Sequence, residues 1–119
     1  MKAVLLASHG SYSPKTKQEI ITLARRLKRR SGRGIVRYAF LEIESPNIPH
    51  GIDLCVQDGA TEIIVLLNFL NSGKHADQDI PKIIRNATLR HPGIKIRMTK
   101  PLAHHPQFVK FLATMIRPS

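Results

Sequence analysis

The fold is decided by residues 2–11, which read Lys-Ala-Val-Leu-Leu-Ala-Ser-His-Gly-Ser. The uninterrupted apolar run at residues 3–7 is typical of a strand buried on both faces, as in a parallel sheet. His9 directly follows this run, and Gly10 allows a turn before a helical pattern begins. Because ligands of an open α/β sheet bind where strands end and helices begin, His9 is a candidate ligand-binding residue.

A second stretch repeats this arrangement. The apolar run at residues 63–70 is followed by residues 72–81, which read Ser-Gly-Lys-His-Ala-Asp-Gln-Asp-Ile-Pro. His75 therefore also lies between a predicted strand and a predicted helix. Two histidines at equivalent points of two strand-to-helix connections are expected at the same edge of the sheet.

Strand-like and helix-like patterns alternate four times along the chain. We predict strands at residues 2–7, 35–41, 61–67 and 94–99, and helices at residues 14–31, 47–58, 77–90 and 106–116. This alternation predicts an α/β fold with helices on both faces of a parallel sheet. Right-handed crossovers and the common doubly wound connection give the strand order 2-1-3-4. Residues 1–119 contain no linker or repeat and are predicted to form one domain.

Apolar residues at helical spacing predict which helix faces are buried. In the last helix, Phe108, Phe111, Leu112 and Met115 are expected to face inward. Cys55 is the only cysteine and falls on the apolar face of the second helix, so we expect a small core residue and no intrachain disulfide. A lone thiol with no evident signal peptide favours a cytoplasmic location, and no apolar run is long enough to span a membrane.

The predicted strand order places three polar side chains together. The loops after strands two, one and three open side by side and carry Glu42, His9 and His75. A single cation could be shared among them. Imidazole suits cobalt, nickel, iron and zinc, and a site with only two or three protein ligands leaves positions open for exchange.

Nearby residues have plainer interpretations. Ser8 and Ser11 flank His9 without a nucleophile-elbow pattern, so turn formation or capping is favoured over catalysis. Gly10 and Gly73 do not form a phosphate-binding fingerprint and are expected to serve the turns.

Four further polar residues lie near the predicted edge. Asp77 and Asp79 either cap a helix or accept a hydrogen bond from an imidazole. His104 and His105 lie at the same predicted edge of the sheet, and at most one of these adjacent imidazoles is expected to join the site.

The chain is strongly basic. It has 19 Lys and Arg against 8 Asp and Glu, a formal charge of +11. Much of this charge falls between Arg25 and Arg37, at the end of the first predicted helix, where cations complement the helix dipole. The same charge would also attract polyanions, including nucleic acid, although the chain has no Trp, two Tyr and four Phe to stack on bases.

Taken together, these segments resemble the short, single-domain CbiX-type class II chelatases, the sirohydrochlorin chelatases. The resemblance covers nearly the whole chain. It rests on residues 5–11, on residues 40–42 with Pro46, on residues 59–67, on residues 73–75 followed by residues 79–81, and on residues 101–102.

The resemblance implies a flavodoxin-like, three-layer chelatase fold and insertion of a divalent metal into sirohydrochlorin. The metal is expected to be Co²⁺, with Fe²⁺ or Ni²⁺ as alternatives, for cobalamin, sirohaem or a nickel tetrapyrrole, and no organic cofactor is expected. His9 and His75 carry over as metal ligands and proton acceptors, and Glu42 as the acidic catalytic residue. Substrate binding is expected in the loops that contain Ser8, Gly10, Ser11, Asn71, Ser72, Gly73 and Lys74.

The resemblance also concerns partners. Short members are expected to pair as homodimers with the tetrapyrrole in the cleft. Lys74, Arg85, Arg97 and Lys100 are candidates for steering or clamping this polycarboxylate. Two other functions remain open at this point: a non-catalytic carrier of metal or tetrapyrrole, which uses the same ligands, and a basic nucleic-acid-binding domain.

Overall fold

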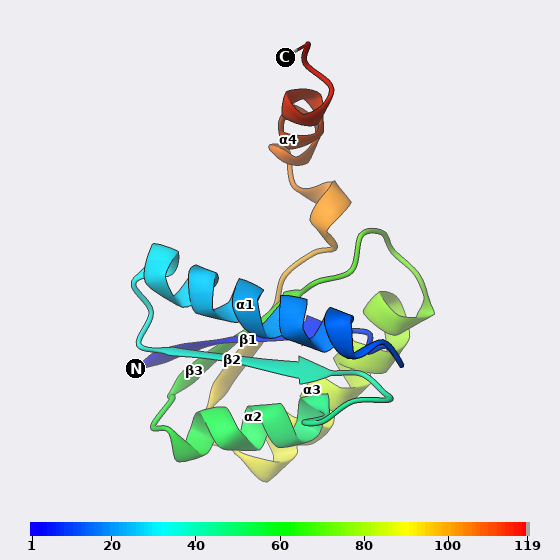
Figure 1. Ribbon diagram of the computed structural model, residues 1–119. Coiled ribbons are helices and arrows are strands. Elements are labelled where there is room, and N and C mark those ends of the chain that lie inside the picture. Colours follow the sequence, from blue (N-terminus) through cyan, green and yellow to red (C-terminus); the bar gives the residue numbers. More distant parts are fainter. Residues whose placement is uncertain (119) are drawn as a thin grey trace.

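A single sheet of four parallel strands forms the centre of the molecule, in a computed structural model that describes residues 1–118. The strands are β1 (Lys2–Ser8), β2 (Ile35–Phe40), β3 (Glu62–Leu67) and β4 (Lys95–Met98). Their order is β2-β1-β3-β4 (Figure 1), so the predicted α/β fold and strand order are confirmed. β1 is the most buried strand, and the two central strands β1 and β3 each have a neighbour on both sides.

Helices lie on both faces of the sheet, as Figure 1 shows. Helix α1 (Pro14–Ser31) covers one face, where Ile20 and Ala24 pack with Leu6 and Phe40. Helices α2 (Ile48–Gln57) and α3 (Ile80–Arg90) cover the other face and form the larger core. Alternate residues of β1, β2 and β3 supply the two cores, which is the period-two pattern of a sheet covered on both faces. β4 contributes Ile96 and Met98 to the larger core only.

Local signals explain where the helices begin and end. Pro14 opens α1, where its missing N–H costs no hydrogen bond, and Gly32 ends it in the left-handed region at φ 69°. Asn47 caps α2 by accepting the His50 backbone N–H at 2.9 Å. Cys55 is completely buried in α2, as predicted, and burial raises the pKa of its thiol to about 11.

The last helix contradicts the prediction that its apolar residues face inward. Helix α4 (Phe108–Met115) projects away from the sheet (Figure 1), and Phe111, Leu112 and Met115 are exposed while Phe108 is half-buried. The reason lies in the preceding segment. Leu102 and Ala103 N–H groups donate to the carbonyls of Phe69 and Leu70 at 2.8 and 2.9 Å, which directs the chain outward before α4 begins.

The projecting helix lengthens the molecule. The radius of gyration is 14.7 Å, with extents of 51 × 31 × 30 Å, whereas a compact chain of this length is expected to have a radius of gyration of about 13.5 Å. Within residues 1–118, no helix combines the length and the apolar character needed to cross a membrane.

The strand register sets the position of the functional loops. Ser8 pairs with Phe40, and Ala7 pairs with Leu67, so β1, β2 and β3 end at the same level. The residues that follow these strands therefore emerge side by side at the carboxyl edge of the sheet.

Candidate metal site

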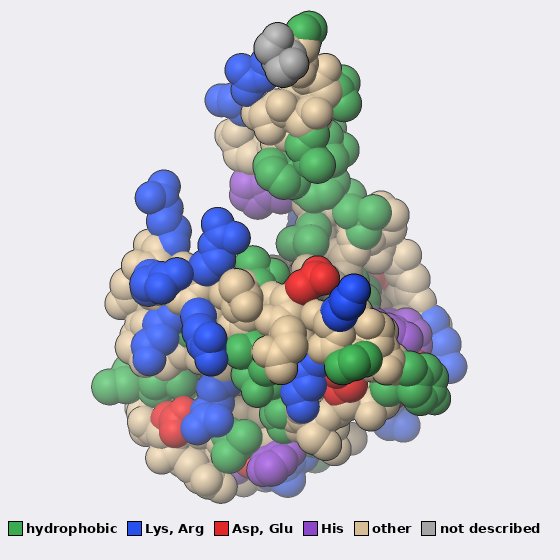
Figure 2. Space-filling view, viewed as in Figure 1, with side chains coloured by type: hydrophobic (Ala, Val, Ile, Leu, Met, Phe, Trp, Pro, Cys, Tyr) green, Lys and Arg blue, Asp and Glu red, His purple; other side chains and the backbone are tan. Residues whose placement is uncertain are grey.

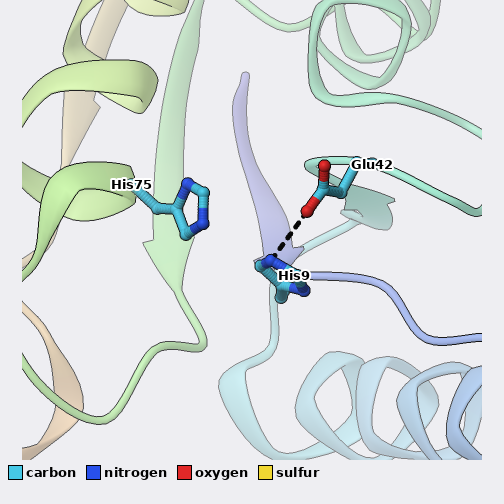
Figure 3. Close-up of side chains that lie close together, drawn as sticks. All are labelled: His9, Glu42 and His75. Atoms are coloured by element: carbon cyan, nitrogen blue, oxygen red, sulfur yellow. Dashed lines mark ion pairs between the residues drawn. The ribbon is translucent and has the colours of Figure 1, made fainter.

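Three side chains meet at the carboxyl edge of the sheet. His9, Glu42 and His75 each offer a ligand atom, and these atoms all lie within 4.8 Å of one another. Figure 3 shows the three side chains converging from the ends of β1 and β2 and from the start of the helical segment after β3. The prediction that these loops open side by side is confirmed, and the spacing is compatible with a shared divalent cation.

His9 and Glu42 already contact each other. His9 Nε2 lies 2.9 Å from Glu42 Oε1 (Figure 3), and His9 Nδ1 lies 3.2 Å from the Gly10 carbonyl oxygen. If Nδ1–H donates to that carbonyl, Nε2 either donates a proton to Glu42 or offers a lone pair to a cation. A cation and a proton therefore compete for the same position between His9 and Glu42.

His75 is oriented by Asp79. Residues His75–Asp79 form a π-helical turn directly before α3, and His75 Nδ1 lies 2.8 Å from Asp79 Oδ2. With its Nδ1–H donated to this carboxylate, His75 presents Nε2 as the ligand atom, as is usual for metal-binding histidines. Of the two roles left open for Asp79, orientation of an imidazole is the one this contact supports.

The two imidazoles remain accessible. Their ring centroids are 5.0 Å apart, and their side chains are 45% (His9) and 41% (His75) exposed. Phe69 lies beside His75, with ring centroids 6.5 Å apart. A cation held here would be open to solvent on one side, which leaves coordination positions free for exchange.

Gly10 permits the close approach of the loops after β1 and β2. Its φ is +103°, and a Cβ atom on it would lie 1.9 Å from the Glu42 carbonyl oxygen. The Glu42 N–H also donates to the His9 carbonyl at 3.1 Å. The glycine is therefore needed for both backbone conformation and space, which agrees with its predicted service in the turn.

Ser8 and Ser11 stabilise these loops through hydrogen bonds to other residues of the protein. Ser8 is buried at 5% exposure, and its hydroxyl accepts a hydrogen bond from Asn68 Nδ2 at 3.0 Å. Ser11 N–H donates to Glu44 Oε1 at 2.9 Å, and the Ser11 hydroxyl accepts from Ser13 N–H at 3.1 Å. Both serines are held within the protein's own hydrogen bonds, as expected for turn formation.

The loop before His75 is exposed. Asn71, Ser72, Gly73 and Lys74 all face solvent, and the Gly73 carbonyl accepts the Asp77 N–H at 2.8 Å. Ser72 Oγ lies 3.2 Å from His104 Nε2.

The two adjacent histidines after β4 do not join the site. His105 Nδ1 accepts the Gln107 N–H at 3.0 Å, while His104 faces Ser72. Among residues 1–118, the grouping of possible metal ligands consists of His9, Glu42 and His75 and includes neither His104 nor His105.

Two groups of basic side chains lie in different parts of the molecule. Arg97 and Lys100 line a cavity of about 680 Å³ at the end of β4, together with His104 and His105. The basic run within α1 lies elsewhere, because α1 leads from the end of β1 back to the start of β2. Figure 2 shows Lys and Arg side chains gathered over the end of α1 that leads into β2. That run therefore lies away from His9 and His75.

Sequence reasoning missed two neighbours of the site, Ile43 and Glu44. Ile43 has φ +74°, and Glu44 anchors Ser11 across the two loops. Residue type did not signal either role. A β-branched residue such as Ile43 rarely adopts positive φ, and the contact of Glu44 with Ser11 joins two loops that are distant in sequence.

Comparison with known proteins supports the resemblance. The CbiX family model matches residues 3–119. Sirohydrochlorin ferrochelatase of Bacillus subtilis is 33% identical over 92% of this chain and 42% of its own length. Sirohydrochlorin cobaltochelatase of Methanococcus maripaludis is 37% identical over 71% of this chain and 58% of its own.

A solved structure has the same fold. The sirohydrochlorin chelatase SirB from Bacillus subtilis subspecies spizizenii, in complex with cobalt, matches with a TM-score of 0.85 and 33% identity. The match covers 95% of this chain and 48% of that one. The chain thus spans about half the length of these three relatives. By its sequence from residue 3 onward and by its fold, the chain belongs to the CbiX family.

Proposed function

We propose that this protein is a sirohydrochlorin chelatase that inserts Co²⁺, or alternatively Fe²⁺ or Ni²⁺, into the tetrapyrrole within one domain of residues 1–119. The observation that carries the proposal is the convergence of His9, Glu42 and His75 within 4.8 Å at an open edge of the sheet. Relatives named as ferrochelatases and cobaltochelatases support the reaction class. The lone buried thiol of Cys55 fits a reducing compartment, and we propose the cytoplasm.

The chemistry requires a metal held loosely and two protons removed. His9 and His75 are proposed as the metal ligands, since neutral imidazoles bind these cations and two or three protein ligands leave the metal exchangeable. As the metal enters the ring, two pyrrole N–H protons must leave. Glu42, 2.9 Å from His9 Nε2, can take a proton directly or relay one from that imidazole.

Positive charge suits the substrate. Sirohydrochlorin is a polycarboxylate, and Lys74 directly precedes His75, while Arg97 and Lys100 lie at the end of β4. These three exposed cations, with Arg85 on α3, are proposed to attract or clamp the carboxylates, and Asn71, Ser72 and Gly73 to contact the substrate beside them.

The direct test is metal insertion under anaerobic conditions. Purified protein is mixed with sirohydrochlorin and, in turn, Co²⁺, Fe²⁺ and Ni²⁺, and the absorbance change is compared with the uncatalysed rate. His9→Ala and His75→Ala should each abolish the acceleration, whereas His50→Ala, an exposed histidine on α2, should retain it. Tight binding of metal or tetrapyrrole without acceleration would instead indicate a carrier.

We further propose that two copies pair through α4. The exposed large apolar side chains of α4 are Val109, Phe111, Leu112 and Met115, and Ile116 follows directly after the helix. Figure 2 shows hydrophobic side chains on this projecting segment. A helix with such a face needs a partner surface in water.

The chain itself offers a complementary groove. Leu66 of β3 is only partly buried beneath α1. A cavity of about 810 Å³ beside α1 is lined by Leu23 and Leu27, by Phe111 of the same copy, and by Arg26, Arg29 and Arg30, so its apolar part is the pair of leucines. A stable interface buries roughly 1,200–2,000 Å² of total surface, so the exchanged helices would have to cover most of each other's apolar faces to form a lasting dimer.

Two variants test whether α4 docks on α1 of the other copy or on α1 of its own copy. Leu23→Asp alters the groove and Phe111→Asp alters the helix, and both side chains are exposed, so folding should persist. Each variant alone should be monomeric by light scattering. A mixture should recover dimers, because an intact helix of one copy meets an intact groove of the other. Leu89→Asp, an exposed residue on α3, is the matched control and should remain dimeric. A monomeric wild-type protein would contradict the pairing.

A further inference from the structure

Residues Glu42, Ile43 and Glu44 form a tight turn after β2 that the proposed reaction uses only through Glu42. The Glu44 N–H donates to the Glu42 carbonyl at 2.8 Å, and Ile43 between them has φ +74°. A γ-turn with positive φ at its centre is rare and strained. A β-branched residue is especially unfavourable there, whereas glycine or asparagine would adopt the same backbone at lower cost.

Contacts on both sides hold this turn in place. Ser11 N–H donates to Glu44 Oε1 at 2.9 Å, and the Glu42 N–H donates to the His9 carbonyl at 3.1 Å. Gly10 lies beneath the turn, so that a Cβ built there would be 3.5 Å from Ile43 Cβ. These contacts offset the strain at Ile43 and fix its side chain beside the His9 loop.

The Ile43 side chain gains little burial in return. It is 46% exposed, and it lines a shallow cavity of about 330 Å³ with Tyr12 and Lys17. Tyr12 is 90% exposed and Leu70 is 53% exposed. These three large apolar side chains come from the connections after β2, β1 and β3, the same three that carry the candidate metal ligands.

We propose that Ile43 contacts the apolar ring of the tetrapyrrole and holds it over His9, Glu42 and His75, with Tyr12 beside it. The inference rests on the proposed chelatase function. A flat ring that presents a metal-binding centre and an apolar surface matches three ligands whose connections also carry exposed apolar side chains. The strain at Ile43 is then the cost of placing an apolar side chain next to Glu42, since glycine would relax the turn but contact nothing.

The test compares stability with substrate affinity in Ile43→Gly. Glycine relieves the positive φ, so the midpoint of thermal unfolding should stay the same or rise by a few degrees. Loss of the apolar contact should weaken binding of metal-free sirohydrochlorin about tenfold and raise KM by a similar factor. The affinity for Co²⁺ alone, measured by calorimetry, and kcat should change by less than about threefold, because the ligands stay in place.

Two further variants define the outcomes. Ile43→Leu keeps an apolar side chain and should restore KM to within about threefold of wild type, and Leu89→Ala, remote and 81% exposed, should leave KM unchanged. If Ile43→Gly lowers the unfolding midpoint together with Co²⁺ affinity, or binds sirohydrochlorin as wild type does, the substrate contact is overturned while the chelatase function stands. If wild type neither binds sirohydrochlorin nor accelerates insertion, the proposed function fails and the role of Ile43 fails with it.

Discussion

Replacing Gly10 with alanine should separate the two loops that build the candidate site. The new Cβ would lie 1.9 Å from the Glu42 carbonyl oxygen, and real Cβ contacts below 3.0 Å are essentially absent. The backbones of the His9 and Glu42 loops must therefore separate by at least about 1 Å, because no flexible side chain can give way. In addition, φ +103° costs any residue with a Cβ about 1–2 kcal/mol.

The expected loss has two measurable parts. Strain and displacement together should lower the free energy of unfolding by about 2–5 kcal/mol, measured by urea denaturation. A displacement of about 1 Å between catalytic groups should lower the rate of metal insertion about a hundredfold. Co²⁺ affinity should fall as well, since His9 and Glu42 would no longer lie 2.9 Å apart.

Two other glycines provide matched controls. Gly59 has φ +101° but no atom within 4 Å of a built Cβ, so Gly59→Ala should cost only the backbone part, about 1–2 kcal/mol, with activity unchanged. Gly93 has neither positive φ nor a neighbour, so Gly93→Ala should stay within about 0.5 kcal/mol of wild type. A Gly10→Ala protein that matches Gly59→Ala in stability and retains full insertion activity would refute this reasoning.

Three further outcomes are expected. Asp79→Asn should weaken Co²⁺ binding about tenfold or more without changing the unfolding midpoint, because the His75 ring loses its carboxylate partner; unchanged affinity would contradict that orientation. Burial raises the pKa of the Cys55 thiol from 9.0 to about 11, so a thiol reagent at pH 8 should react only as the chain unfolds, and rapid labelling of native protein would be inconsistent with this. The free energy of unfolding should decline as pH rises from 9 to 11, because the thiol of the unfolded chain ionises first. The hydrogen bond from Arg37 holds the pKa of Asp58 below 3.8, so the ion pair stabilises the fold above that pH and loses this effect on further acidification. Asp58→Asn should lower the free energy of unfolding by less than about 1 kcal/mol at pH 7, since solvent screens this one-third-exposed pair, and the stability difference from wild type should vanish in acid.

The sequence predicted the sheet and the location of the site because both depend on local pattern and general handedness. Apolar runs and helical spacing gave the strands and helices to within a few residues, as in β2, predicted at residues 35–41 and observed as Ile35–Phe40. Right-handed crossovers then gave the strand order. Once the order is known, His9, Glu42 and His75 must emerge at one edge, and their ligand atoms lie within 4.8 Å.

Two features depended on tertiary structure, and a third on the geometry of one local helical turn. Helix α4 has the apolar spacing of a buried helix, yet Met115 is 69% exposed, because hydrogen bonds to Phe69 and Leu70 set the direction of the chain before the helix. Asp79 was one of two acidic candidates until the π-helical turn brought it to His75. Ile43 adopts positive φ only because Ser11 and His9 hold the turn from outside.

The physical distinction is one of range. Burial periodicity, capping and strand handedness act over neighbouring residues and are written in the order of residue types. The direction of α4 and the strained turn at Ile43 arise from hydrogen bonds between segments some 30 residues apart in sequence, such as that from Ser11 to Glu44. The sequence by itself therefore determined which residues gather at the site, and the tertiary structure decided how each is held and which apolar faces remain uncovered.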